Sequence, residues 1–361
     1  MKINQILLKN YRNFSKISIN FQDKTNIFFG DNGSGKTNIL ESISLISKGR
    51  GIRNSSLKDL VKSEEKNFYI KSNIEIKNNE YDIEIFTNPN DIKLKKIVTI
   101  NNDVSSESQK FLNSSTSFLN FLPEMERLFQ SSPSYRRNFI DRLIFSEDSN
   151  YNKLINKYKK NITERSIILQ SNNIDINWIS YLETEISKIG LQIYKLRYSK
   201  LKMLNDSIKK LNNKNNYPFI IEFSIIDSFY NDNLDEMKYI DSIKDCREFD
   251  KNFGGLKFGP HKSDIRAQIN NNHDASKLST GQQKTIVLLT LLAQCNYLVN
   301  EKNIEPILLL DEICSHLDKN NRNLLLELIN QFDIQFFLTG TEKTLFSFIS
   351  TNVKFYNITN I

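Results

Sequence analysis

Two hydrophobic patterns alternate along the chain, and each predicts a different kind of element. Short runs of consecutive apolar residues at 27–29 and 307–310 are typical of strands buried on both faces of a parallel sheet. From residue 68 to residue 100 apolar and polar positions alternate, and a polar turn follows at 101–103, which predicts an antiparallel meander. The pattern therefore indicates an α/β protein that also contains antiparallel strands.

Helical spacing predicts a long arm in the middle of the chain. Apolar side chains recur there at three-, four- and double-turn steps, with Lys200 in the one missing step, at Trp178, Leu182, Ile186, Ile189, Ile193, Leu196, Leu204, Ile208 and Leu211. A helix over roughly 35 residues would be about 50 Å long. With the segment 151–169 it is expected to form a helical hairpin. The apolar stripe is explained by packing within the hairpin, and a partner-binding face is the alternative.

Elements on both sides of this arm predict a core that is split in sequence. We expect a helix at 38–47, an apolar helix at 285–299, and a helix around 322–331 that leads to a strand at 334–338. The pieces before and after the arm would then share one sheet, with a mainly helical lobe inserted between them. The expected boundaries are 1–122, 123–277 and 278–361.

The residues after the first apolar run fit the phosphate-binding pattern G-x-x-x-x-G-K-[ST]. They are Gly30, Asp31, Asn32, Gly33, Ser34, Gly35, Lys36 and Thr37. The glycines let successive N–H groups point at phosphates, and the following helix adds its positive N-terminal end. Lys36 would reach the β- and γ-phosphates of ATP, and Thr37 would hold Mg²⁺. A flexible Gly/Ser loop is the alternative, which the flanking strand and helix disfavour.

Two carboxylates follow the second apolar run. A buried parallel strand would deliver them at its carboxyl end, where Asp311 would bind the Mg²⁺ shell and Glu312 would act as a general base toward the attacking water. Alone, this run would be interpreted as a core strand that ends in an acidic turn. Paired with the phosphate-binding pattern, it predicts the catalytic half of a nucleotide site, with Lys36 and Glu312 as the catalytic residues.

A polar helix entrance lies between the two motifs. Ser279, Gly281 and Gln282 begin an apolar helical stretch, where free N–H groups can bind an anion, although a simple capping sequence would look similar. Together with the phosphate loop, the carboxylates and the segment 315–318, this L-S-x-G-Q run resembles the motif set of ABC-type ATPases. In that family the serine motif of one subunit closes on the nucleotide of the other, which implies an ATP-dependent homodimer.

Three further segments narrow the resemblance. Residues 8–14, 132–142 and 259–264 are similar to signatures of the RecF family, bacterial DNA replication and repair proteins related to the heads of SMC proteins. The similarity spans essentially the whole chain. It implies an ABC-type P-loop ATPase core, in which a mixed sheet with an antiparallel meander carries an inserted α-helical lobe. The inserted segment is too short for the very long coiled coil of SMC proteins.

The resemblance also implies a function in recombinational repair, replication restart and the SOS response to DNA damage. Members of this family are expected to bind single-stranded and double-stranded DNA as an ATP-gated dimer, and to assist the loading of RecA recombinase with RecR and RecO. A transporter ATPase subunit is a rival class, which the inserted arm disfavours. An overcoming-lysogeny-type nuclease is a second rival, for whose added nuclease domain this length leaves no room.

The charge of the chain is compatible with nucleic-acid binding. Lysine and arginine total 49 against 42 acidic residues, a formal net charge of +7. Candidate DNA contacts are Lys9, Arg12, Arg50 and Arg53, on a surface that would meet phosphates without reading bases. Basic residues along the arm around Arg197 are the alternative, and for each residue an ordinary solvated charge is a further one.

One departure from the ABC pattern bears on turnover. Thr339, Gly340 and Thr341 stand where many ABC ATPases place a switch histidine, and a hydroxyl cannot shuttle protons as imidazole does. We therefore expect slow hydrolysis, in a weak DNA-dependent ATPase that uses ATP as a switch. The residue that contacts Mg²⁺ from the Q-loop is left open between Glu124 and Gln130.

The cysteines and the N-terminus give no sign of export. Cys246, Cys295 and Cys314 show no metal-type pairing, and they predict ordinary core or loop thiols. No signal-peptide pattern follows Lys2, and the longest apolar stretch is far shorter than a membrane span. The sequence therefore predicts a cytoplasmic protein without a membrane partner.

Overall fold

The computed structural model divides the chain into two compact units. It describes residues 1–47, 49–90, 94–171, 175–215, 220–231, 234–270, 273–315, 317–350 and 352–359. The first unit, the two-sheet unit, contains Met1–Glu126 and Thr280–Ile361, and the second, the inserted unit, contains Arg127–Ser279. The boundaries that the sequence suggested lie a few residues before these divisions.

A five-stranded parallel sheet forms the centre of the two-sheet unit. Its order is β13-β3-β12-β11-β7, with bounds β3 Thr25–Phe29, β7 Phe118–Phe121, β11 Ile307–Leu310, β12 Phe336–Gly340 and β13 Val353–Asn357. Because β3 pairs with both β12 and β13, the N-terminal and C-terminal pieces share one sheet, as predicted. Every residue of β11 and β12 is buried, which explains their continuous apolar sequences.

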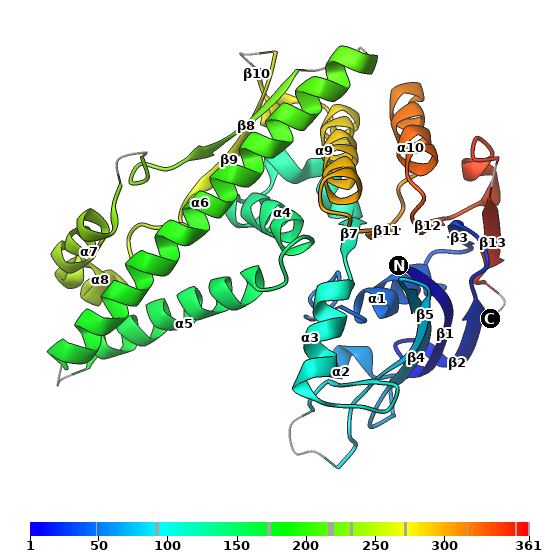
Figure 1. Cartoon of the computed structure of the whole chain (residues 1–361), viewed down its shortest axis with the longest axis horizontal. Coiled ribbons are helices and arrows are strands. Elements are labelled where there is room, and N and C mark those ends of the chain that lie inside the picture. The colour runs from blue at the N-terminus through cyan, green and yellow to red at the C-terminus, as the bar shows by residue number, and fades with distance from the viewer. Residues whose placement is uncertain are drawn as a thin grey trace. The chain divides into compact units, whose positions relative to one another are not determined.

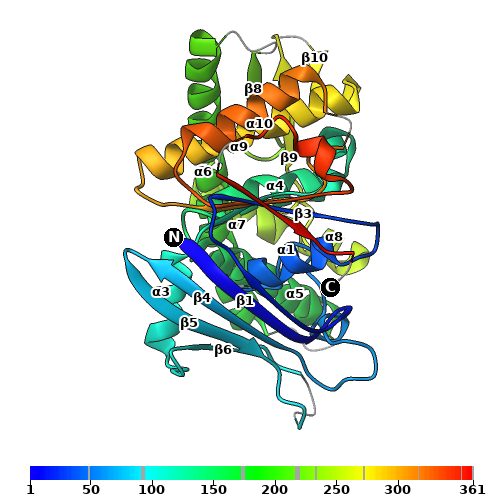
Figure 2. The ribbon, with the colours of Figure 1, turned by 90° about the vertical axis from the view of Figure 1, so that its right-hand side faces the viewer.

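Helices cover both faces of this sheet. The paired helices α9 (Thr280–Asn300) and α10 (Lys319–Gln331) lie on one face, and α1 (Lys36–Ser44) lies on the other, above the second sheet of the unit (Figures 1 and 2). Helix α9 is buried around most of its circumference, in keeping with its nearly uninterrupted apolar sequence. None of the helices in the described part of the chain is long and apolar enough to cross a bilayer.

The second sheet of the two-sheet unit is antiparallel, with the order β2-β1-β4-β5-β6. Its elements and the short helices beside it are β1 Lys2–Tyr11, β2 Phe14–Asn20, α2 Leu57–Leu60, β4 Tyr69–Ile76, β5 Asn79–Phe86, β6 Ile97–Ile100 and α3 Ser106–Ser115. Strands β4 to β6 are the predicted meander, and buried residues alternate along β4. The fold class predicted from the sequence is confirmed, with the strands divided between a parallel and an antiparallel sheet.

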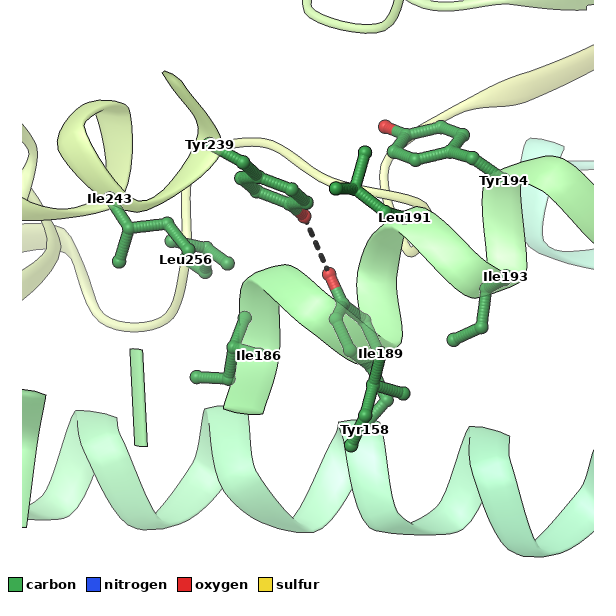
Figure 3. Close-up of a cluster of buried hydrophobic side chains, with 9 residues drawn as sticks. All are labelled: Tyr158, Ile186, Ile189, Leu191, Ile193, Tyr194, Tyr239, Ile243 and Leu256. Carbon is green, nitrogen blue, oxygen red and sulfur yellow. Dashed lines mark hydrogen bonds between the residues drawn. The ribbon is translucent and has the colours of Figure 1, made fainter. Parts of the chain in front are cut away.

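The inserted unit is built on the predicted hairpin. Helix α5 (Tyr151–Gln170) packs against α6 (Ile176–Asn215), a single helix of 40 residues. The other helical segments are Pro123–Gln130, which runs into this unit, α4 Pro133–Phe145, α7 Glu236–Asp245 and α8 Arg247–Phe253. Figure 3 shows Ile186 and Ile189 of α6 packed near Tyr158 and Tyr239, so the apolar stripe is core over this stretch.

A three-stranded sheet in the inserted unit was missed at the sequence level. Strands β8 (Ile221–Ile226), β9 (Asp264–Ile269) and β10 (His273–Asp274) form it in the order β10-β9-β8. Burial alternates along the whole of β9 and over the first three residues of β8, so a period-two signal was present in the sequence. Strands β8 and β9 lie far apart along the chain, and only their pairing makes either of them recognisable as part of a sheet.

The expectation of a basic surface around Arg197 is wrong. Arg197 is 3% exposed, and its guanidinium makes two hydrogen bonds of 2.8 Å to the Asp141 carboxylate. Lys200 is equally buried and pairs with Glu147 at 2.9 Å. Both cations form ion pairs inside the unit, because a buried charge without a partner would be strongly destabilising. Two other lysines of this stretch, Lys195 and Lys202, are exposed.

Candidate nucleotide-binding site

Three strands of the parallel sheet deliver polar residues to one edge. Strand β3 leads into the glycine-rich loop at 30–37, β11 leads into Asp311 and Glu312, and β12 carries Thr339. Because parallel strands run in the same direction, their carboxyl ends meet. The Thr37 hydroxyl donates a hydrogen bond of 2.9 Å to Asp311 Oδ1, so the two motifs adjoin in space.

The loop has a backbone that demands glycine at two positions. Gly35 has φ of 107°, and a Cβ there would lie 2.5 Å from the Phe14 ring. Gly30 has φ of 143°, and a Cβ there would lie 2.5 Å from Thr359 Oγ1. The Asn13 amide also donates to the Ser34 carbonyl at 3.0 Å, which fixes the loop against the turn after β1. The pattern of glycines is thus required by the path of the backbone.

Lys36 lies across the loop that it follows. Its Nζ donates to the carbonyls of Gly30 at 2.8 Å and Asp31 at 2.7 Å. Burial lowers the pKa of Lys36, and the nearby carboxylates of Glu312 and Asp311 oppose this change. The ammonium therefore lies inside the loop, with acidic groups close by, where it could bind the phosphate of a nucleotide.

Asp311 is a buried carboxylate held by hydroxyl groups. Burial raises its pKa, and the hydrogen bonds from Thr339 and Thr37 oppose the rise. The positive charge of Arg53 also opposes it, whereas the negative charge of Glu124 adds to it. Asp311 makes no ion pair within the described ranges. A hard, oxygen-binding cation beside Asp311 and Thr37 would compensate this charge, so these two side chains fit Mg²⁺.

Glu312 has an unusual backbone that the same hydroxyl stabilises. Its φ is 48°, in the left-handed region, and its N–H donates to Thr339 Oγ1 at 2.8 Å. The Thr339 hydroxyl itself donates to Asp311 Oδ1 at 2.6 Å. Thr339 is fully buried, so it positions the two carboxylate residues instead of facing a ligand. This role of Thr339 was not anticipated from the sequence.

The two candidates for the Q-loop residue have different surroundings. Glu124 lies near enough to Asp311 for its charge to raise the pKa of that residue. The Gln130 amide instead donates to the carbonyls of Ser276 and Leu278 at 3.2 and 3.4 Å, within the inserted unit. The negative charge of Glu124 near Asp311 therefore favours Glu124 over Gln130 as the Q-loop residue, and this assignment stays a prediction.

The L-S-x-G-Q segment forms the exposed start of α9. Ser279 precedes the helix, Gln282 lies in its first turn, and both are exposed. A Cβ added at Gly281 would meet no atom within 4 Å. The Gly281 carbonyl accepts hydrogen bonds from Thr285 at 3.1 Å and from Asn321 at 3.2 Å, which joins the start of α9 to α10. The start of α9 is thus joined to α10, while its Ser279 and Gln282 side chains are exposed.

A buried lysine connects this helix to the carboxylate strand. Lys284 Nζ donates to Glu126 at 2.7 Å and to the Ser315 carbonyl at 2.9 Å. Ser315 begins the predicted segment 315–318, of which His316 lies outside the described residues. Because Ser315 follows Glu312 closely, Lys284 joins the L-S-x-G-Q helix to the strand that carries the candidate base.

The four basic residues proposed to contact DNA have different environments. Lys9 and Arg50 are exposed. Arg12 donates two hydrogen bonds of 2.9 Å to Glu41, a fully buried residue of α1, and its pKa is raised because this pairing outweighs burial. Arg53 donates to the Asn38 side chain of α1 at 3.1 Å. Arg12 and Arg53 are therefore already hydrogen-bonded to side chains of α1, the helix that follows the glycine-rich loop.

Comparison with known proteins places this geometry in a family. The family model described as the RecF/RecN/SMC N terminal domain matches residues 2–360. The DNA replication and repair protein RecF of Rickettsia canadensis is 33% identical over 347 residues, which cover 94% of this chain and 94% of that protein. The chain belongs to the RecF family. The RecF of Rickettsia felis is also 33% identical, over 349 residues that cover 94% and 93% of the two chains.

Comparison with solved structures supports the same family assignment. A structure of the recombination mediator protein RecF with ATP, in the RecFOR pathway, has a TM-score of 0.81 at 25% identity and covers 99% of this chain and 97% of that one. An SMC head bound to the C-winged helix domain of ScpA has a TM-score of 0.54 at 18% identity and covers 95% and 90% of the two chains. The latter likeness is one of fold, that of the ABC-type ATPase head.

Two of the RecF-like segments meet inside the inserted unit. Arg136 of the segment 132–142 makes hydrogen bonds of 2.8 and 2.7 Å to Asp264 of the segment 259–264. The neighbouring Arg137 donates to the Ser263 carbonyl at 2.6 Å. These arginines therefore do not form a solvated helix face. Their role in joining α4 to β9 could not be recognised before the tertiary contacts were known.

Replacing Thr339 with valine should impair hydrolysis while Thr339→Ser preserves it. Valine has nearly the same shape but removes the bonds to Asp311 and to the Glu312 N–H. Loss of a hydrogen bond to a charged group predicts a roughly ten- to hundredfold lower kcat/KM for ATP, with a higher Mg²⁺ requirement. Steady-state hydrolysis over a Mg²⁺ titration measures both. Wild-type turnover in Thr339→Val would show that the hydroxyl does not position these groups.

Proposed function

We propose that this protein is an ATP-dependent DNA-binding protein of recombinational repair and replication restart. In this proposal two ATP molecules close a homodimer on gapped or duplex DNA in the cytoplasm, and hydrolysis reopens it. The observation that carries the proposal is the contact between Thr37 and Asp311, which joins the phosphate loop to the acidic strand end. Its similarity to RecF, of which a solved structure contains ATP, supports the choice of nucleotide.

The ATP phosphates would be bound by the loop at 30–37. The backbone N–H groups would surround them, and Lys36 would exchange its two carbonyl acceptors for phosphate oxygens. Thr37 and Asp311 would hold Mg²⁺, which supplies charge stabilisation for the β- and γ-phosphates when bound. Asp311 would then need to be ionised, as its hydroxyl donors already favour.

Glu312 would activate the water that attacks the γ-phosphate. Its carboxylate follows the strand that carries Asp311, and its backbone is fixed by Thr339. A general base in this place would accept a proton from the water as the new bond to the γ-phosphorus forms and the bond to the departing ADP oxygen breaks. Thr339 is buried and its hydroxyl is bonded to Asp311, so it would not take the place of a switch histidine at the γ-phosphate. We expect a weak DNA-dependent ATPase for that reason.

The second half of each ATP site would come from the other protomer. Ser279, Gly281 and Gln282 lie at an exposed helix start that would bind the partner's γ-phosphate. Lys284 joins that helix to the Ser315 carbonyl, just beyond the candidate base. Binding of the partner's ATP at the start of α9 would thus be linked, within one protomer, to the strand end that carries Glu312.

Partners follow from the family rather than from any one contact. The similar solved protein is described as a recombination mediator in the RecFOR pathway. We propose that this chain works with RecR and RecO, and that it assists RecA loading at gaps, where single-stranded and double-stranded DNA adjoin. A nuclease with the same type of head would instead cut DNA in the presence of Mg²⁺ or Mn²⁺, and a cleavage assay separates these two functions.

Sizing of the full chain tests the proposal. Light scattering should show a monomer without nucleotide and with ADP, and a dimer with ATP, which gapped duplex DNA stabilises further. The same samples should contain uncut DNA. A mass that is indifferent to nucleotide, or appreciable cleavage, would contradict the proposed function.

Neutralising Lys9, Arg50 and Arg53 together should weaken DNA binding on every sequence alike. If each contacts a phosphate, the slope of log affinity against log salt should fall by roughly 0.9 for each lost contact. Arg12 is left in place, because its removal would leave the buried Glu41 carboxylate unpaired. Fluorescence anisotropy over a salt series gives the slope, and the ATP-dependent mass reports any indirect effect of Arg53.

A matched triple variant controls for total charge. Lys188, Lys209 and Lys210 are exposed on α6, so neutralising them removes the same charge from the inserted unit. The salt slope should stay at the wild-type value in this control. A slope lowered only by the α6 changes would move the DNA-binding surface to the inserted unit.

A further inference from the structure

Two RecF-like segments enclose a cavity that the nucleotide site does not use. Ser134, Arg137, Asn138 and Asp141 of α4 line it together with Pro260 and His261 of the loop before β9. Residues of α5 and α6 complete the lining. Its volume is about 150 Å³, which is ample for a small ligand since one ordered water needs only about 10–15 Å³ of such space.

One wall of the cavity is a chain of neutral hydrogen bonds. The hydroxyls of Tyr158 and Tyr239 lie 3.3 Å apart, as Figure 3 shows, and Tyr158 lies 3.1 Å from His261 Nδ1. His261 Nε2 lies 3.0 Å from the Leu256 carbonyl, so this nitrogen carries the hydrogen and donates it to that carbonyl. Nδ1 therefore accepts a hydrogen bond from the Tyr158 hydroxyl. Burial lowers the pKa of His261 to about 4, which keeps the ring neutral at pH 7.

The remaining charges of the cavity are mainly positive. Arg197 is neutralised by its two bonds to Asp141. Arg137 spends one N–H on the Ser263 carbonyl, and no carboxylate of the described residues lies within 4 Å of Arg137 or of the Lys159 ammonium. Burial lowers the pKa of Arg137 and the positive charge of Arg197 lowers it further, whereas the carboxylates of Asp141 and Asp264 oppose this change from a greater distance. Asp141 and Asp264 are themselves paired with Arg197 and Arg136, so Arg137 and Lys159 have no ion-pair partner of their own among the described residues.

We propose that this cavity binds a phosphate monoester group between Arg137 and Lys159. Such a group carries a charge of about −1.5 to −2 at pH 7, which matches the two uncompensated cations. The guanidinium of Arg137 offers N–H donors in a planar fork that suits two phosphate oxygens, and Lys159 adds a point charge. Asn138 and Ser134, both exposed on the same rim, supply neutral donors.

The ligand enters from the solvent side. Lys159, Asn138 and Ser134 are exposed, whereas Tyr158 and Arg197 are buried at the inner side. A terminal phosphate can therefore reach the site while the rest of its molecule stays outside. The phosphate can belong to the end of a DNA strand or to a free small molecule, and the chemistry of recognition is the same for both. This proposal is independent of the dimer and of ATP turnover.

Calorimetric titration with inorganic phosphate tests the site. The full chain is used with Lys36→Ala, because the loop at 30–37 would otherwise bind phosphate too. Arg137→Gln should weaken phosphate binding at least about tenfold, since it removes charge-assisted hydrogen bonds. Lys159→Gln changes an exposed side chain that is not needed for folding, and it should weaken binding roughly two- to fivefold. Lys160→Gln, the exposed neighbour outside the lining, should match the parent protein.

A second measurement identifies the source of the phosphate. Duplex oligonucleotides with terminal phosphates are compared with identical duplexes that end in hydroxyls. Tighter binding of the phosphorylated ends, lost in Lys159→Gln, assigns the site to DNA ends. Phosphate binding without that difference assigns it to a small molecule. The proposal is overturned if the Lys36→Ala protein binds no phosphate, or if Lys159→Gln binds it as tightly as Lys160→Gln does.

Discussion

Glu312→Gln should hold ATP and hardly turn it over. Glutamine keeps the size and hydrogen bonding of the side chain but cannot accept the proton of the attacking water. Loss of a general base predicts a kcat lower by about 10²- to 10⁴-fold. The contacts of Lys36 and Thr37 do not involve the Glu312 side chain among the hydrogen bonds of the site, so affinity for ATP should remain.

Single-turnover hydrolysis and equilibrium nucleotide binding measure the two quantities separately. Because ATP would persist, the dimer should outlive that of the wild type, and DNA should be bound more tightly. Glu107→Gln, an exposed acid on α3, is a matched control that should behave as wild type. If Glu312→Gln hydrolyses ATP at the wild-type rate, the base must be sought elsewhere, and Glu124 is the nearest candidate on electrostatic grounds.

Ser279→Arg should abolish the ATP-dependent dimer and leave ATP binding nearly intact. Ser279 lies exposed immediately before α9, where it would contact the partner's nucleotide. A large side chain there would fill the space intended for the γ-phosphate of the other protomer. The phosphate loop, with Lys36 and Thr37, is unchanged in each chain. We expect the affinity of the protomers for one another to fall at least about a hundredfold, which removes the dimer at micromolar concentration.

Analytical ultracentrifugation with ATP shows the loss directly, and a fluorescent ATP analogue shows that binding survives. Ser279→Ala removes only the hydroxyl and should give an intermediate dimer affinity. Lys277→Ala, an exposed change two residues earlier, should dimerise normally. A dimer that persists in Ser279→Arg would rule out the arrangement in which this motif completes the partner's site.

The engagement of Arg12 changes how DNA-binding variants should be designed. Its bonds to Glu41 connect the turn after β1 to the helix that follows the phosphate loop. Tyr11 and Ser55 also bond to the same carboxylate. A buried carboxylate that loses its cation costs about 3–5 kcal/mol. A variant of Arg12 would therefore confuse a folding defect with a DNA-binding defect.

Local pattern by itself determined the nucleotide-binding elements and the class of fold. The glycine spacing at 30–37 is a property of one short segment, because the backbone path there excludes side chains at Gly30 and Gly35. The apolar run of β11 and the helical period of α6 likewise depend on burial along one element. Each of these signals is complete within a stretch of sequence, so each could be recognised before any contact was known.

Tertiary structure alone decided which charged and polar side chains are available to a ligand. Arg197 and Lys200 look like members of a basic helix face, yet Asp141 and Glu147 neutralise them. Thr339 lies in place of a histidine, yet its hydroxyl holds Asp311 from within the core. The reason is physical: a buried charge or hydroxyl needs a partner, and the partner comes from a distant segment that only the fold brings near.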